Sequence, residues 1–187
     1  MKIGLLALQG NYEKHRQLLL QCDLEPELIR YPHQLEQLSG LVIPGGESTV
    51  MSKLLDSTGL RKPIQDFADS YPILGTCAGV IMLGHPANDE GELKTLGLMN
   101  IKVMRNGYGR QLDSFVDEVS VSIGDQQQLL PATFIRAPRI EAIGPEVEVL
   151  ASYNNEAVAV RQGKHIGLTF HPELDDVTLF HQLAFAD

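Results

Sequence analysis

The chain has 187 residues, of which 43% are hydrophobic and 21% charged, and its formal net charge at pH 7 is −9. A chain of this length can bury a substantial core, so we expect one domain over residues 1–187. The acidic balance, with no basic stripe interleaved with aromatic residues, argues against a nucleic-acid-binding protein. No apolar run approaches the length that spans a membrane.

The cysteine content indicates the compartment. Cys22 and Cys77 are too few for a disulfide framework or a metal-binding set. A bridge is possible on parity alone, but Cys22 lies far from Cys77 in the sequence, at the end of a predicted helix, so a reducing cytoplasm is the simpler expectation. Residues 1–8 are too short for a signal sequence and predict a buried strand instead. We expect a cytoplasmic protein with no metal and no cofactor.

The first half alternates apolar strands with helical spacing. A turn at Gln9 and Gly10 follows the first strand, and Asn11 is a plausible N-cap for the helix after it. This alternation predicts a parallel sheet covered by helices on both faces. The predicted strands are residues 3–8, 28–29, 40–43 and 71–74, and the predicted helices are residues 12–21, 33–38, 49–55 and 60–69.

A glycine-rich loop, Pro44-Gly45-Gly46-Glu47-Ser48-Thr49, joins the third strand to the next helix. Adjacent glycines let backbone N–H groups approach a ligand closely, as an anion or oxyanion site requires. The loop lacks the lysine of a Walker motif and the spacing of a dinucleotide fingerprint, so no nucleotide phosphate is indicated. A plain strand-to-helix turn is the alternative interpretation.

The segment Gly75-Thr76-Cys77-Ala78-Gly79 follows the fourth strand and begins another helix. A cysteine between two glycines at such a junction is typical of a nucleophile elbow, a tight turn that pushes one side chain out above the end of the strand. The helix N-terminus favours the thiolate. Cys77 is therefore the candidate nucleophile, although a small buried apolar residue is the alternative. Consecutive parallel strands place it beside the glycine-rich loop, at the carboxyl edge of the sheet.

The second half predicts an antiparallel part of the sheet. After a polar surface loop over residues 85–94, short strands follow one another closely, and Gln162-Gly163-Lys164 is a hairpin-turn signal between the last two. A polar, glycine-rich segment over residues 105–111 begins with Arg105, which could bind a carboxylate or be a solvated arginine at a strand end. The predicted strands are residues 96–104, 118–123, 133–135, 147–152, 157–161 and 165–170, and a final helix covers residues 176–185.

His171-Pro172-Glu173 ends the last predicted strand. In extended geometry residues two apart project to the same side, so Glu173 can orient the His171 ring. Cys77, His171 and Glu173 together form a set of residues of the kind that generates a thiolate and transfers a proton through the histidine. A structural histidine is the alternative. No argument from neighbours assigns a role to the other histidines, His15, His33, His85, His165 and His181.

The elbow together with His171-Pro172-Glu173 resembles the triad of class I glutamine amidotransferases. Within that group, the sequence resembles the glutaminase subunits of pyridoxal 5′-phosphate synthases. The resemblance implies an α/β fold, a three-layer flavodoxin-like sandwich with a mixed, mostly parallel sheet. The matching motifs are Leu8-Gln9-Gly10, Pro44-Gly45-Gly46-Glu47-Ser48-Thr49, Arg105-Asn106, Gly109-Arg110-Gln111, Phe134-Ile135-Arg136-Ala137-Pro138 and Phe170-His171-Pro172-Glu173-Leu174.

The resemblance implies hydrolysis of L-glutamine to glutamate and ammonia. Cys77 would attack the side-chain amide, His171 would act as acid and base, and Glu173 would hold His171. Backbone N–H groups of Gly46 and Ala78 would stabilise the oxyanion. The residues implied to bind glutamine are Gly46, Glu47, Ser48, Arg105, Ile135 and Arg136.

The resemblance also implies a partner. Ammonia would pass to a separate synthase subunit that builds pyridoxal 5′-phosphate from a pentose phosphate and a triose phosphate, within a large hetero-oligomer. We expect that subunit to dock over the Gln9-Gly10 and Gly45-Gly46 loops. The alternatives are the amidotransferase subunit of histidine biosynthesis, a cysteine hydrolase with another substrate, and a glutamine-binding scaffold without catalysis.

Overall fold

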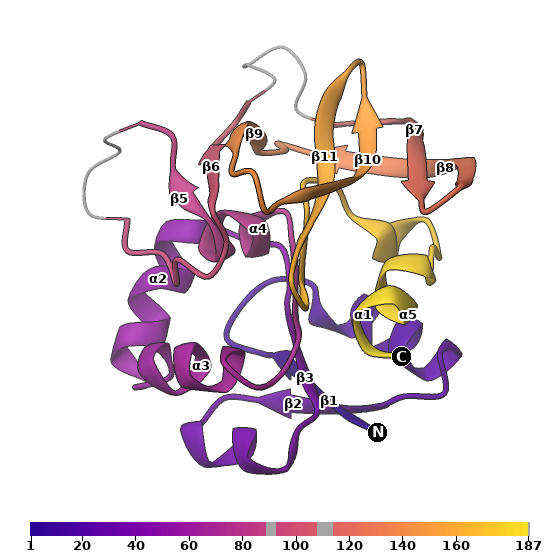
Figure 1. Ribbon diagram of the computed structural model, residues 1–187. Helices are drawn as coiled ribbons and strands as arrows, with labels where there is room; N and C mark the ends of the chain where they lie inside the picture. The colour runs from indigo at the N-terminus through magenta and orange to yellow at the C-terminus, as the bar shows by residue number, and fades with distance from the viewer. Residues whose placement is uncertain (89–92, 108–113, 187) are drawn as a thin grey trace.

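A computed structural model describes residues 1–88, 93–107 and 114–186 (Figure 1). The motif Gly109-Arg110-Gln111, and with it the second half of the polar segment predicted over residues 105–111, lies outside these residues. Two sheets and helices on both sides of the larger one make up the described chain.

The larger sheet is mixed. Each neighbouring pair from β2 to β12 is parallel, and each pair from β12 to β8 is antiparallel. The mixed sheet and its antiparallel second half are confirmed, but the parallel pairings make up half of the sheet rather than most of it, because the hairpins of the second half extend it. From one edge to the other it contains β2 (Glu25–Ile29), β1 (Lys2–Leu6), β3 (Gly40–Ile43), β4 (Ile73–Thr76), β12 (His165–Leu168), β11 (Glu156–Gln162), β10 (Glu148–Tyr153), β7 (Ser114–Ile123) and β8 (Gln126–Ile135).

Helices cover both faces of this sheet, as predicted (Figure 1). On one face lie α1 (Tyr12–Gln21) and α5 (Leu179–Phe185), and on the other lie α2 (Ser48–Ser57), α3 (Arg61–Ala68) and α4 (Ala78–Leu83). The alternation of side chains along a strand divides the core in two. In β3, for example, Val42 packs toward α1 and α5, whereas Leu41 and Ile43 pack toward α2, α3 and α4.

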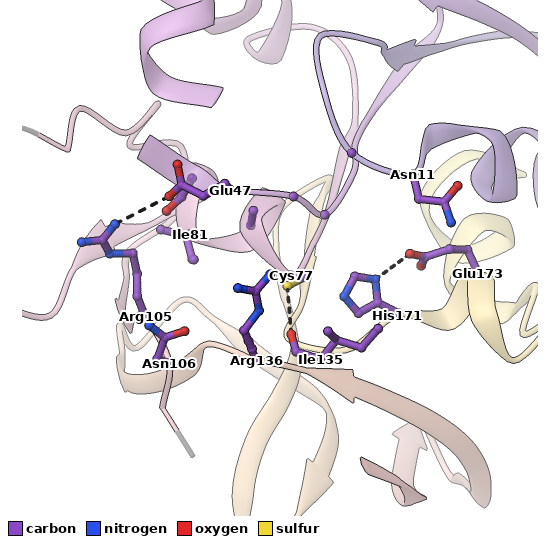
Figure 2. A pocket seen from close by; sticks show the side chains of 15 residues that line it. Asn11, Glu47, Cys77, Ile81, Arg105, Asn106, Ile135, Arg136, His171 and Glu173 are labelled. Atoms are coloured by element: carbon purple, nitrogen blue, oxygen red, sulfur yellow. Dashed lines mark hydrogen bonds and ion pairs between the residues drawn. The ribbon is translucent and has the colours of Figure 1, made fainter. Parts of the chain in front are cut away.

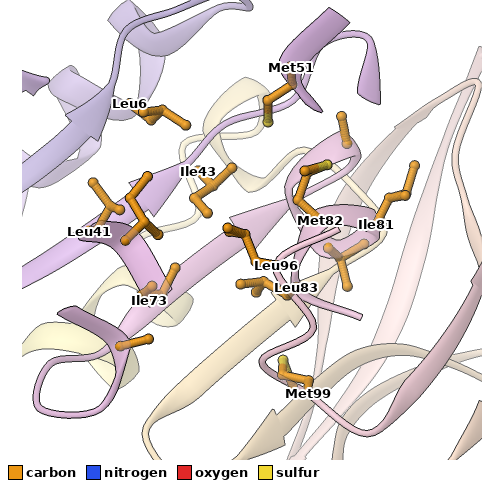
Figure 3. Packing of buried hydrophobic residues seen from close by; sticks show 14 of the residues in the cluster. Leu6, Leu41, Ile43, Met51, Ile73, Ile81, Met82, Leu83, Leu96 and Met99 are labelled. Carbon is orange, nitrogen blue, oxygen red and sulfur yellow. The ribbon is translucent and has the colours of Figure 1, made fainter. Parts of the chain in front are cut away.

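The core on the α2 side is mostly aliphatic and includes several methionines (Figure 3). Met51 of α2 and Met82 of α4 lie in one cluster with Leu41 and Ile43 of β3. On the opposite face the core is partly aromatic, because Phe170 lies between Phe134, whose ring is tilted against it, and Phe180, whose ring meets it edge to face. Both faces of the central strands are thus buried, which is why those strands are continuous apolar runs in the sequence.

A second, three-stranded sheet contains β5 (His85–Pro86), β6 (Ile101–Met104) and β9 (Arg139–Ile143). The strand predicted over residues 96–104 is therefore confirmed only in its second half. β9 was not predicted, because it is short and most of its residues are exposed, although Arg139-Ile140-Glu141-Ala142 alternates polar and apolar residues. The loop predicted over residues 85–94 begins with the two-residue strand β5.

The remaining differences are local. The short helix predicted over residues 33–38 is the 3₁₀ helix η1 (Pro32–Gln37), and the final helix begins only at Leu179. Asn11 occupies the N-cap position of α1, but its side chain accepts no capping hydrogen bond. The hairpin turn at Gly163 is confirmed, since Gln162 pairs with His165 across it. Across the described part of the chain, no helix combines the length and apolar character needed to traverse a membrane.

Candidate active site

A cavity of about 450 Å³ lies where β3, β4, β8 and β12 end (Figure 2). The four strand ends meet because β3, β4 and β12 run parallel, and the end of β8 reaches the same edge from the antiparallel part. Every residue predicted to form the site lines this cavity: Gly46, Glu47, Ser48, Cys77, Ala78, Arg105, Ile135, Arg136, His171 and Glu173.

Cys77 sits on a strained turn between β4 and α4. Its backbone has φ 51° and ψ −108°, in a region that L-residues rarely adopt. Its N–H donates a hydrogen bond to the carbonyl oxygen of Leu168 in β12 at 2.8 Å. The Sγ atom lies 3.8 Å from the carbonyl oxygen of Ile135, to which the thiol can donate. The turn and its bonds hold the sulfur at the cavity.

The glycines on both sides of Cys77 are required by space. A Cβ atom at Gly79 would lie 2.1 Å from the carbonyl oxygen of Ile43, and one at Gly75 would lie 2.7 Å from the carbonyl carbon of Gly79. Real Cβ atoms do not approach backbone this closely. The Gly-x-Cys-x-Gly pattern therefore follows from the packing of α4 directly against β3 and β4.

His171 follows β12 and is held by β8. Its N–H donates to the carbonyl oxygen of Thr133 at 2.9 Å, and Thr133 in turn donates from its N–H and its hydroxyl to Asp175. The expected extended geometry is wrong, because the chain turns into the 3₁₀ helix η2 (Pro172–Leu174). The turn still brings Glu173 Oε1 to 2.6 Å from His171 Nδ1.

The electrostatics favour a charged His171–Glu173 pair. Burial acts to lower the pKa of His171, but its interactions with Cys77 and Glu173 outweigh burial and raise the pKa to about 10. Burial likewise acts to raise the pKa of the 2%-exposed Glu173, yet the neighbouring His15 and His171 hold it below its usual range. Each group is buried, and each depends on a partner of opposite charge.

The glycine-rich loop lies beside the imidazole. A Cβ atom at Gly45 would lie 2.6 Å from His171 Cε1 and 3.4 Å from Cys77 Cβ. Gly46 adopts φ +148° and is covered by Gln9. The Gln9 side chain donates to the Glu47 carbonyl oxygen at 2.9 Å and accepts from the Glu47 N–H at 3.1 Å. Backbone atoms thus form this wall of the cavity.

Glu47 and Arg105 line the far side of the cavity. Glu47 caps α2, accepting from the N–H groups of Thr49 and Val50 at 3.0 and 2.8 Å. Desolvation acts to raise the pKa of Glu47, but these bonds and the Arg105 charge hold it below its usual value. Arg105 Nη1 donates to Thr49 Oγ1 at 2.8 Å and lies 4.0 Å from Glu47 Oε1, an ion pair that Figure 2 marks.

Ile135 and Arg136 complete the wall at the end of β8. Arg136 has φ 41°, the left-handed conformation, directly after the strand. Within the described residues, no group of His, Cys, Asp or Glu side chains is arranged to hold a metal ion.

A buried polar cluster behind Glu173 was not found from the sequence. His15 of α1 and His181 of α5 are both fully buried, with His15 Nδ1 3.0 Å from His181 Nε2. His15 Nε2 lies 3.1 Å from Thr76 Oγ1 and 3.4 Å from Glu173 Oε2. The only sequence signal was a histidine at a core position of each helix, which alone does not predict contact.

Comparison with known proteins places this cavity in context. Residues 5–186 match the model of the SNO glutamine amidotransferase family. The chain belongs to this family. Two curated relatives carry the name pyridoxal 5′-phosphate synthase subunit PdxT: the Shouchella clausii protein is 44% identical, covering 97% of this chain and 92% of the relative, and the Geobacillus thermodenitrificans protein is 48% identical, covering 94% and 89%.

Solved structures agree with the SNO glutamine amidotransferase fold. A crystal structure described as a glutamine amidotransferase superposes with a TM-score of 0.90 at 36% identity, covering 97% of this chain and 98% of that one. The Thermotoga maritima PurLQS structure superposes with a TM-score of 0.74 at 17% identity, covering 99% and 97%, and shows a common fold only. The expected three-layer α/β fold and family are therefore confirmed.

Proposed function

We propose that the chain is the glutaminase subunit of a pyridoxal 5′-phosphate synthase and that residues 1–187 form one glutaminase domain. The observation that carries the proposal is the juxtaposition of Cys77, His171 and Glu173 in one cavity, in a chain 44–48% identical to PdxT relatives over almost its whole length. The reaction is hydrolysis of the side-chain amide of L-glutamine to L-glutamate and ammonia.

In the first step the Cys77 thiolate attacks the amide carbon. The C–S bond forms, and the carbonyl π electrons move to the oxygen, giving a tetrahedral oxyanion. The backbone N–H groups of Gly46 and Ala78, which both line the cavity, are proposed to stabilise it. His171 then donates its proton to the nitrogen as the C–N bond breaks, and ammonia leaves a thioester on Cys77.

In the second step His171, now neutral, accepts a proton from water, and the resulting hydroxide attacks the thioester. The C–S bond breaks, the thiolate returns, and glutamate is released. Glu173 holds the imidazole by the 2.6 Å contact throughout and stabilises its charged form. A His171 pKa raised to about 10 supports this role, because an imidazolium facing a thiolate is the resting state that the first step needs.

Glutamine recognition is proposed to use the remaining walls of the cavity. Arg105 and Arg136 can bind the α-carboxylate, and Glu47 can accept from the α-ammonium. Ser48 and the backbone of Gly46 and Ile135 complete the substrate contacts. These assignments follow from the lining of the cavity and from the resemblance of the same motifs to the family.

Ammonia that escapes to water is protonated and lost, so we propose that it passes to a synthase subunit within a large hetero-oligomer. A cytoplasmic location is proposed because both cysteines are free thiols. The net charge of −9 supports a protein partner over nucleic acid. Docking is proposed over the Gln9-Gly10 and Gly45-Gly46 loops, where Gln9 is bonded to the loop that borders His171.

The test is glutamate and ammonia release from glutamine by the purified chain, with and without a pyridoxal 5′-phosphate synthase subunit. Cys77→Ala is the blank. We expect release that rises strongly with the synthase subunit and vanishes in the variant. Absence of release from an assembled complex would refute the function. Co-purification with a histidine-pathway synthase instead would redirect it to that pathway.

The docking surface is tested with Gln9→Lys. A charge at this position should weaken complex formation, whereas Lys14→Glu, on the exposed side of α1, should not. Undiminished assembly of the Gln9→Lys protein counts against docking at this loop.

A further inference from the structure

The buried side of the candidate active site contains two histidines to which the proposed mechanism gives no role. His15 and His181 are both 0% exposed, and they come from α1 and α5, which cover the face of the sheet opposite to α4. Fully buried imidazoles are costly unless their nitrogens are paired. Their placement next to the carboxylate of Glu173 therefore needs an explanation.

The contacts form a continuous line from His171 to His181. Glu173 uses Oε1 for His171 Nδ1 at 2.6 Å, and its other oxygen, Oε2, lies 3.4 Å from His15 Nε2. On the far side of the His15 ring, Nδ1 lies 3.0 Å from His181 Nε2. Oε2 of Glu173 is buried and makes no hydrogen bond within the described residues, and His15 Nε2, at 3.4 Å, is the group placed to satisfy it.

Only one arrangement of protons suits this line. A proton on His15 Nε2 faces the Glu173 carboxylate, with Thr76 Oγ1 at 3.1 Å as a second acceptor. Nδ1 of His15 is then an acceptor and takes the proton of His181 Nε2. His181 Nδ1, which lacks a partner among the described residues, is left as a bare acceptor. The opposite tautomers would leave a buried, unpaired N–H at His181 Nδ1 and would point the lone pair of His15 Nε2 at the Glu173 carboxylate. That arrangement costs more free energy.

We propose that His15 is a positioning residue, a neutral imidazole that donates its Nε2 proton to Glu173 Oε2 and that is fixed in this tautomer by the N–H of His181. The relay holds the carboxylate in the plane of the His171 ring and keeps it anionic. The inference deepens the proposed function, because it concerns the residues that orient the proposed base.

The charge state of the neighbours agrees with this assignment. Burial lowers the pKa of His15, against the opposing attraction of Glu173, and burial together with His15 lowers the pKa of His181 well below its usual value. The titratable groups that act on Glu173 are His15 and His171, and Cys77 acts on His171 in turn. Two neutral rings therefore support one imidazolium–carboxylate pair.

The experiment follows the alkylation of Cys77 by iodoacetamide between about pH 3 and pH 9, with the Cys77 peptide quantified by mass spectrometry. Cys22 is the internal reference, because it lies outside the cavity. The acid limb is the part of the profile in which the rate of Cys77 alkylation falls as the pH decreases. His15→Leu removes the donor to Glu173, so Glu173 is protonated at higher pH and the acid limb moves to higher pH. The expected shift is about one pH unit, the size expected for one lost hydrogen bond to a charged group. His15→Gln, whose amide nitrogen can replace Nε2, keeps the wild-type limb.

Two further variants separate positioning from folding. His181→Leu leaves the contact with Glu173 in place but frees the His15 tautomer, so it should shift the limb in the same direction as His15→Leu. His165→Leu removes a buried histidine that accepts from the Ile73 N–H, away from the cavity, and should lower the unfolding temperature without moving the limb. In the complex with the synthase subunit, His15→Leu should lower kcat by roughly ten- to a hundredfold, with KM within about twofold.

The proposal is overturned if His15→Leu leaves the limb in place, or if His15→Gln, folded to the same melting temperature, shifts it equally. Equal shifts in His165→Leu would also overturn it. Alkylation does not depend on glutamine turnover. If the variants show the predicted shifts but the wild-type complex hydrolyses no glutamine, the proposed function is refuted and the positioning role stands.

Discussion

The N–H of Cys77 donates to the carbonyl oxygen of Leu168 at 2.8 Å, which ties the elbow to the last residue of β12. Because Cys77 follows β4 and His171 lies three residues beyond the end of β12, the proposed nucleophile and the proposed base stand at the ends of adjacent parallel strands. Their separation is therefore set by sheet geometry rather than by loop conformation.

The strained backbone at Cys77 predicts that the turn needed to present the thiol lowers the free energy of unfolding. Cys77→Gly should abolish glutamine hydrolysis yet raise the free energy of unfolding by about 1 kcal/mol over Cys77→Ala, since glycine adopts a φ of 51° without steric cost and alanine does not. Urea unfolding of the two variants measures the difference. Equal stabilities would show that the turn stores no strain.

The contact between α4 and β3 predicts a large effect of one methyl group. Gly79→Ala gains helix propensity, but its Cβ would lie 2.1 Å from the Ile43 carbonyl oxygen, so we expect a net destabilisation of roughly 1–3 kcal/mol and loss of activity. The control is Gly163→Ala, where φ is +56° and no atom lies within 4 Å. Its cost is that of backbone strain alone, about 1 kcal/mol, with activity retained.

The raised pKa of His171 predicts how stability depends on pH. With an ordinary value of 6.5 in the unfolded chain and about 10 in the folded one, this contribution is complete below about pH 6.5 and is lost as the pH rises to about 10. The difference in unfolding free energy between wild type and His171→Gln should therefore shrink across that range. A difference independent of pH would contradict the charged pair.

His165 is the control, because its contribution to the unfolding free energy should depend on pH in the opposite direction. Burial lowers its pKa to about 4, so the folded state disfavours its protonation. The difference between wild type and His165→Gln should shrink as the pH falls from about 6.5 to 4, and stay constant above.

The N-cap of α2 predicts a moderate loss of stability when Glu47 is replaced. Glu47→Ala removes the acceptor of the Thr49 and Val50 N–H groups and should cost about 1 kcal/mol, with Glu47→Gln intermediate. Glu13→Ala, which removes an exposed ion pair with Arg16, should change stability by less than about 0.5 kcal/mol. Denaturant titration distinguishes the two. An equally small loss at both positions would mean that the cap is not formed in solution.

The proposed role of Arg105 predicts a change in substrate affinity. Arg105→Lys cannot donate to Thr49 and bind a carboxylate with the same planar fork, so the KM for glutamine should rise about tenfold with kcat little changed. Lys102→Met, on the exposed side of β6, should leave both constants unchanged. An unaltered KM in Arg105→Lys would remove this residue from the carboxylate site.

Much of the fold was predictable because its signals are local. The buried parallel strands are apolar runs, and the glycines around Cys77 mark a turn that few other residues allow. β9 was missed because it is a short, mostly exposed strand rather than an apolar run, and the extended geometry at Glu173 was wrong because Pro172 begins a 3₁₀ turn.

The two buried histidines behind the candidate site, His15 and His181, could not be predicted from the sequence. His15 and His181 lie 166 residues apart in the sequence, and each occupies a position where a helix would place a core residue. Only the topology, which stacks α1 beside α5 behind the end of β12, brings their rings together. Pairing of this kind is a property of the assembled sheet and has no local sequence pattern.

The position of β12 has a consequence for synthesis. This strand is the last in the described chain, yet it lies in the interior of the sheet, between β4 and β11. While the chain emerges from the ribosome, β4 exposes an unpaired edge until nearly the whole sequence has been translated. The candidate base then arrives together with the strand that closes that edge, so the nascent chain holds the Cys77 thiol without His171 until that strand is added.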